Sequence, residues 1–126
     1  MKDSIVQNKS FDLAVSVHQK VTEVQKKHKD FLFSQWWAES IAAIGLNVYL
    51  AQAIHSARGF SIHLYTARKA TYRSLFWTRL LHQAGSLSDE EAADCESLLT
   101  EIAKILQASL ATVNAKKVKT ETVATT

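Results

Sequence analysis

The chain contains no proline, and its only three glycines lie at positions 45, 59 and 85. Proline and glycine interrupt helices more than other residues do, so this chain favours long, uninterrupted helices. Hydrophobic residues make up 47% of the 126 residues, and no stretch shows the sustained alternation of a half-buried strand. These features predict an all-α protein of one domain with a substantial core.

Capping and stop signals divide the chain into four expected helices. The helices are predicted over residues 10–29, 30–57, 60–84 and 88–114. Ser10 is a candidate N-cap, Gly85 is a typical helix stop, and Ser88 with Glu91 forms a capping box. Residues 1–9 are expected to form a flexible N-terminus, and residues 115–126 a disordered basic tail. Short connections make consecutive helices antiparallel neighbours, which predicts an up-down-up-down four-helix bundle over residues 10–114.

The second and third helices carry more apolar surface than a four-helix bundle needs to bury. Their aromatic residues are Trp36, Trp37, Tyr49, Tyr65, Tyr72, Phe76 and Trp77. Adjacent helical positions point about 100° apart, so at least one residue of the Trp36–Trp37 pair is expected to pack inside, although an exposed tryptophan could stack on bases. We expect the surplus apolar surface to be buried against other copies of the chain in a homo-oligomer.

The segment LYTARKATYRSLFWTRLL, residues 64–81, has apolar side chains on every side of its expected helix and no acidic residue. Its cations are Arg68, Lys69, Arg73 and Arg79. Residues 40–88 contain no Asp or Glu at all, whereas residues 89–101 contain six acidic residues and no basic one. Such an uneven distribution of charge is more informative than the net charge of +3.

Two interpretations of these cations remain open. In the first, they form salt bridges to the fourth helix, because Arg79 lies near the level of Glu91 and Asp94, and Arg73 near the level of Glu101. In the second, an oligomer gathers them into a basic surface that binds phosphates with little sequence preference.

No pattern typical of catalysis or metal binding is present. The chain lacks nucleotide-binding, hydrolase and zinc-protease motifs, and none of its five histidines are three or four residues apart. The single cysteine, Cys95, excludes an intramolecular disulfide and is expected to be a small core residue. We therefore expect a non-enzymatic, cytoplasmic protein without metal or cofactor, whose uncharged residues 40–54 form a buried helix rather than a membrane span.

Two segments of the sequence resemble a known family. LYTARKATYRSLFWTRLL and the fourth-helix segment LLTEIAKILQASLATVNAKK, residues 98–117, resemble Avd, the accessory variability determinant of bacterial diversity-generating retroelements. More loosely, Gln35, Ser40, Ile41, Asn47 and the turn GSLSDEE, which begins at Gly85, resemble the broader four-helix bundle family encoded in intervening sequences of large-subunit ribosomal RNA genes.

The resemblance to Avd implies a ring-like homo-oligomer, a homopentamer, that binds a reverse transcriptase and its template RNA or cDNA without catalytic activity of its own. Arg79, Lys104 and Lys116 stand at matching basic positions. Together with the charge argument, this gives the candidate nucleic-acid-binding residues Arg68, Lys69, Arg73, Arg79, Lys104, Lys116 and Lys117. The alternative is a structural four-helix bundle oligomer that docks another protein and has no nucleic-acid role.

Overall fold

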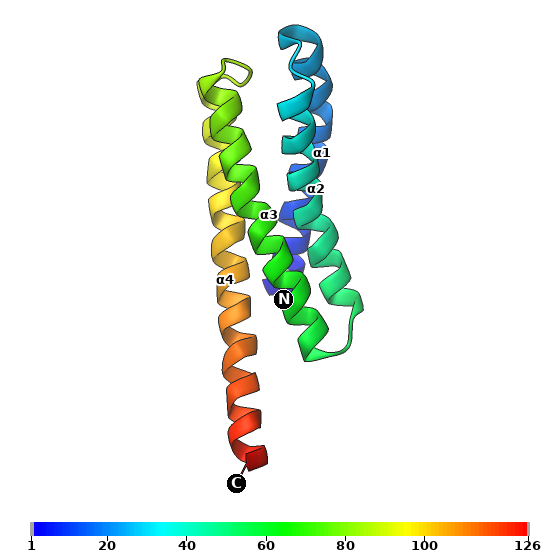
Figure 1. Cartoon of the computed structure of the whole chain (residues 1–126), viewed down its shortest axis with the longest axis vertical. Helices are drawn as coiled ribbons and strands as arrows, with labels where there is room; N and C mark the ends of the chain where they lie inside the picture. Colours follow the sequence, from blue (N-terminus) through cyan, green and yellow to red (C-terminus); the bar gives the residue numbers. More distant parts are fainter. Residues whose placement is uncertain (1, 126) are drawn as a thin grey trace.

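The protein is an all-α four-helix bundle, as predicted. The computed structural model describes the backbone of residues 2–125 and the side chains of residues 5–115, and contains no strand within residues 2–125. The elements are α1 (Lys2–His28), α2 (Leu32–Ala53), α3 (Ala57–Gln83) and α4 (Asp89–Thr125). Consecutive helices run antiparallel (Figure 1). Among the described residues α1 and α3 each pack against both α2 and α4, so α1 lies diagonally opposite α3, and α2 diagonally opposite α4. The ring-like assembly of several copies stays a prediction.

Helix α1 begins at Lys2, not at the predicted N-cap Ser10. Ser10 is fully buried inside the helix, where its hydroxyl donates to the carbonyl of Gln7 over 3.2 Å. Val6 is 1% exposed and continues the apolar stripe of Leu13 towards the N-terminus. The helix therefore extends through most of residues 1–9, for which we predicted a flexible segment.

The turn between α1 and α2 depends on Asp30. Lys29 adopts a positive φ of 54°, which ends α1. The Asp30 carboxylate then accepts hydrogen bonds from the backbone N–H groups of Phe33 (3.2 Å) and Ser34 (3.4 Å), so it caps the first turn of α2. Its second oxygen accepts from the hydroxyl of Ser86 in the distant α3–α4 turn over 3.4 Å. Asp30 thereby joins two turns at the same end of the bundle.

The turn between α2 and α3 lies earlier than predicted, because a serine rather than a glycine defines it. Ile54 is extended, and the Ser56 hydroxyl accepts from the N–H of Gly59 over 3.1 Å, so α3 starts at Ala57 instead of Phe60. Gly59 lies inside the first turn of α3. A Cβ atom there would come within 2.5 Å of the Ile54 side chain, so the glycine serves close packing rather than helix termination.

The predicted boundary between α3 and α4 is confirmed. Gly85 has a φ of +84°, and the N–H of Ser86 donates to the carbonyl of Leu81 over 2.8 Å, which is a helix-stop geometry that favours glycine. In the capping box, the Ser88 N–H donates to Glu91 (3.0 Å) and the Glu91 N–H donates to the Ser88 hydroxyl (3.1 Å). Helix α4 continues past the predicted end at residue 114 to Thr125, through the segment 115–125 that we expected to be disordered, and projects beyond the other helices (Figure 1).

Small side chains fill the seam between α2 and α3. Most of the buried residues of α3 are small: Ala67, Ala70, Thr71, Ser74 and Thr78, beside Leu64 and Leu81. The hydroxyls in this seam all find partners. The Trp37 indole N–H donates to the Thr78 hydroxyl over 3.0 Å, and the Ser74 hydroxyl lies 2.9 Å from that of Ser40. A buried polar network therefore fixes how α3 is rotated against α2.

A small cleft separates α1 from α4. It has a volume of about 40 Å³, and its lining includes Leu13 and Lys20 of α1, Trp37 of α2, and Cys95 of α4. Cys95 is 7% exposed and its sulfur lies 3.5 Å from the Thr78 hydroxyl. The predicted core position of Cys95 is confirmed.

Replacing Thr78 by valine should destabilise the bundle by about 1–3 kcal/mol, because the buried Trp37 N–H loses its acceptor. Thr66→Val is the matched control, since Thr66 lies on the same helix and its hydroxyl makes a similar bond to the Ile62 carbonyl, but the side chain is exposed. The control should change stability by less than about 0.5 kcal/mol. Urea unfolding of both variants measures the difference, and equal losses would contradict a special role for Thr78.

The capping box should make stability depend on acid pH. The hydrogen bond from the Ser88 backbone holds the pKa of Glu91 below its ordinary value of 4.5. A carboxylate with a lowered pKa in the folded state stabilises the protein above the unfolded-state pKa, and this stabilisation is lost as the pH falls through the folded-state pKa. Glu91→Gln should therefore be destabilised most at neutral pH and approach the wild type below pH 4.5. Unfolding free energies across pH test this, with the exposed Glu90→Gln as the control; a constant difference would contradict it.

Candidate nucleic-acid interface

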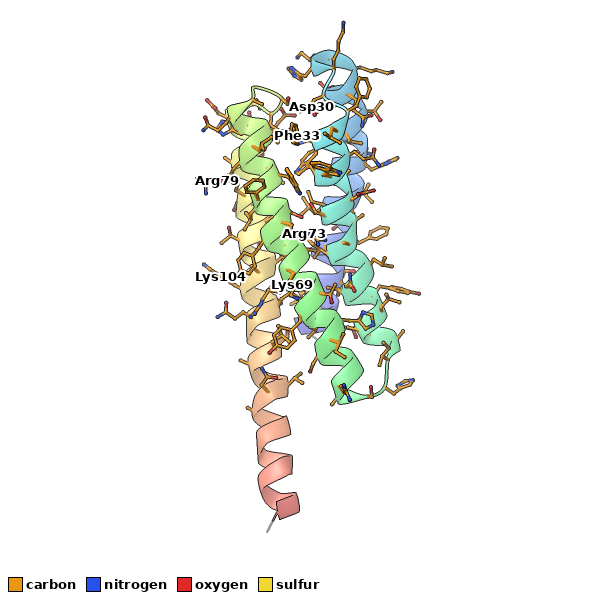
Figure 2. All side chains as sticks on the ribbon, in the orientation of Figure 1. Asp30, Phe33, Lys69, Arg73, Arg79 and Lys104 are labelled. Carbon is orange, nitrogen blue, oxygen red and sulfur yellow. The ribbon has the colours of Figure 1, made fainter. Side chains whose placement is uncertain are left out.

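The side of α3 that faces away from the bundle is lined with aromatic and cationic side chains. Because the buried residues of α3 are small or aliphatic, none of its aromatic or charged side chains is fully buried. We define the α3 outer face by the exposed residues Tyr65, Lys69, Tyr72, Arg73, Phe76 and Arg79. Figure 2 shows the three cations following one another along α3. Two aromatic residues, Tyr72 and Phe76, are 52% and 59% exposed.

Lys69, Arg73 and Arg79 make no ion pair within the described part of the chain. The salt bridges considered for Arg73 and Arg79 are therefore not formed. Glu101 faces α1 instead, where its carboxylate pairs with Lys9 over 3.0 Å, and the Glu91 carboxylate accepts from the Ser88 backbone within the capping box. Asp89 of α4 does contact α3, where its carboxylate lies 2.6 Å from the ring nitrogen of His82, but this contact involves neither Arg73 nor Arg79.

Arg68 lies on the flank of the α3 outer face rather than on it. Its guanidinium carbon is 5.3 Å from the centre of the Tyr65 ring, a cation–π contact, and the side chain is partly buried. The Tyr65 hydroxyl in turn accepts from Asn114 of α4 over 3.0 Å. Arg68 therefore packs on a tyrosine that is itself hydrogen-bonded to α4.

The remaining predicted cations lie on α4. Lys104 is exposed on α4, as Figure 2 shows. The side chains of Lys116 and Lys117 lie outside the residues whose side chains the structure describes. Three of the seven predicted cations are thus exposed on the outer side of α3, with Arg73 and Arg79 about 120° apart around the helix. Arg68 is partly buried on the same helix, and Lys104 stands on the neighbouring helix.

A cluster of aromatic rings adjoins the α3 outer face and joins α2 to α3. The ring centres of Trp36 and Trp77 are 5.2 Å apart, and Phe33 lies 5.7 Å from Trp36 and 5.9 Å from Trp77. Phe76 joins the cluster through an edge contact of 4.9 Å with Trp77. Trp36 is 40% exposed, whereas Trp37 is buried, so one residue of the tryptophan pair packs inside as predicted.

Sequence reasoning missed Phe33 as a member of this cluster. Phe33 and Trp36 are three residues apart on α2, which is the spacing of neighbours on one helix face. That spacing was enough to predict a contact between Phe33 and Trp36. Their contacts with Trp77 depend on how α3 is rotated about its axis, which residue spacing on α2 cannot predict.

No cluster of three or more potential metal ligands occurs among the described residues. Burial raises the pKa of the Cys95 thiol, which makes it a weak nucleophile at neutral pH. None of the four helices, over its described residues, combines the length and the apolar character that crossing a membrane requires.

Comparisons with known proteins identify relatives of the whole bundle. The sequence model of the family described as "23S rRNA-intervening sequence protein" matches residues 2–108. A crystal structure of a protein of unknown function from the S23 ribosomal protein family of Bacteroides thetaiotaomicron is similar, with a TM-score of 0.84 and 27% identity over 87% of this chain and 98% of that one. No curated protein gives a significant match.

A pair of double-mutant cycles should show that the cations of the α3 outer face do not pair with α4. Lys9 and Glu101 should couple by about 0.2–1 kcal/mol, as exposed ion pairs do. Arg73 and Glu101 should show a coupling energy near zero. Unfolding free energies of the single and double alanine variants give both values at low salt. A larger coupling for Arg73 than for Lys9 would contradict the arrangement described.

Proposed function

The chain belongs to the 23S rRNA-intervening sequence protein family, and we propose that this member is a non-catalytic accessory protein that binds nucleic acid. The phosphates would lie on the α3 outer face. One observation carries the proposal: Lys69, Arg73 and Arg79 are all exposed on the outer side of α3, and the chain has no acidic residue between positions 40 and 88 to neutralise them. Clustered cations bind phosphates by releasing condensed counterions, which gives affinity with little sequence preference.

The accessory role rests on the resemblance to Avd. The first resembling segment, residues 64–81, supplies the α3 outer face, and the second, residues 98–117, supplies Lys104. In this proposal the protein acts with a reverse transcriptase of a diversity-generating retroelement and binds the template RNA or the cDNA. A ring-like homo-oligomer such as a pentamer would repeat the cations around the particle, which would compensate for the low net charge of one chain.

A second candidate function is a structural oligomer that docks another protein. The observation that favours it is the partly exposed cluster of Phe33, Trp36, Trp77 and Phe76, because tryptophan and other aromatic residues are enriched at protein interfaces. In this case the cations would serve assembly. Substitution of Arg73 or Arg79 would then change the oligomer and leave any binding of nucleic acid unaffected.

The double reversal Arg73→Glu/Arg79→Glu should weaken binding of a labelled structured RNA and flatten its dependence on salt. Each lost phosphate contact reduces the slope of log K against log salt by about 1. Affinity is measured by fluorescence anisotropy across a salt series, and particle mass is measured in parallel by light scattering.

Lys26→Glu/Lys27→Glu is the matched control. It makes the same change in net charge on exposed positions of α1, which lies diagonally across the bundle from α3. The control should lose much less affinity than the α3 variant. Equal losses would mean that only net charge matters, and a changed mass with unchanged RNA affinity would favour the structural oligomer.

A further inference from the structure

Two aromatic rings on the α3 outer face border a shallow depression. Its lining consists of Tyr72, Leu75, Phe76, Arg79, Leu80 and Gln83, and its volume is about 590 Å³. Tyr72 and Phe76 are one turn apart and both more than half exposed. The depression thus combines apolar walls with the hydrogen-bonding side chains of Arg79 and Gln83.

The spacing of Tyr72 and Phe76 along the helix axis suits a flat ligand. Four helical residues rise by about 6 Å, which is close to two stacking intervals of about 3.4 Å, as needed when one base lies between two rings. Arg73 and Arg79 lie within one or two turns of both rings, where they can reach the phosphates on either side of such a base. Base–aromatic stacking is sequence-tolerant because every base has a π-face.

We propose that this depression takes an unpaired base of single-stranded nucleic acid, stacked against Tyr72 and Phe76 with its flanking phosphates at Arg73 and Arg79. This inference rests on the proposed function and specifies its ligand. A duplex covers the faces of its bases by stacking them on each other, so it can use the cations but not the rings. Phe76 also contacts Trp77 at 4.9 Å, so the platform for following bases continues into the cluster with Trp36.

Charge distinguishes this ligand from a second copy of the chain that docks through the same face. Two copies docked symmetrically through the α3 outer face would place Lys69, Arg73 and Arg79 of one against the same residues of the other. The face contains no acidic residue that could offset this repulsion. A polyanion with open aromatic faces complements both the charge and the exposed rings.

The test compares a single-stranded oligonucleotide with a duplex of the same length, using the full chain and the variant Tyr72→Leu/Phe76→Leu. Leucine keeps the helix and the apolar character but removes the rings. Single-strand affinity should fall about 5- to 150-fold, as expected for losing the stacking of one base. The salt slope should stay unchanged because the cations remain, and the affinity for the duplex should stay within about twofold of wild type.

Tyr49→Leu, compared with the single variant Phe76→Leu, is the matched control. Tyr49 is 60% exposed, nearly the same as Phe76, but it lies on α2, which contains no Lys or Arg. It should leave both affinities unchanged. Circular dichroism melts verify that each variant folds, and ultraviolet cross-linking of the single strand, mapped by mass spectrometry, should mark Tyr72 or Phe76 in the wild type.

The outcomes separate this inference from the proposed function. Equal losses for single strand and duplex, or no loss for either, would overturn the stacking site while leaving phosphate binding by Arg73 and Arg79 in place. A changed particle mass in Tyr72→Leu/Phe76→Leu would assign the rings to an interface between copies and also overturn the site. If the wild type bound neither oligonucleotide, the proposed function and this inference would both fail.

Discussion

The close contact between α2 and α3 determines how the rest of the bundle is arranged. Serine, threonine and alanine side chains fill this seam, and the Trp37 indole inserts among them to reach the Thr78 hydroxyl at 3.0 Å. Asn47 of α2 adds a second link, 3.0 Å from the ring nitrogen of His63. Each buried hydroxyl would cost free energy if unpaired, so rotating α3 away from this arrangement would leave several polar groups without partners at once.

This constraint explains why α3 presents its largest side chains to solvent. Once small residues take the inner positions, the intervening positions of the helix must carry Tyr72, Phe76 and the cations outward. Exposing large apolar side chains forgoes about 1.5–3 kcal/mol each relative to burial. The bundle already has a full core of aliphatic residues, so the exposed rings are available for contacts outside the chain, and their mixture with unpaired cations favours a polyanionic ligand over an uncharged one.

The sequence predicted where the helices lie better than it predicted which side of each helix faces the core. Four helices and the Ser88–Glu91 capping box follow from local patterns, because helix formation and capping depend on neighbouring residues. The α2–α3 turn was misplaced because Gly59 is a stronger local stop signal than Ser56, whereas close packing against Ile54 is a tertiary effect. The outer side of α3 could not be predicted from periodicity, since apolar residues occur all round that helix. For the same reason, the height of Glu101 along the bundle could not by itself show whether its partner is Arg73 or, as observed, Lys9.

A cysteine in the narrow cleft between α1 and α4 can be used to detect the separation of these two helices. Cys95, the single thiol, lines this cleft and is almost completely covered. A reagent can reach its sulfur only when α1 moves away from α4 or the bundle unfolds. The rate of alkylation under native conditions therefore measures how often the α1–α4 seam opens, and its dependence on denaturant distinguishes a local separation of α1 from global unfolding.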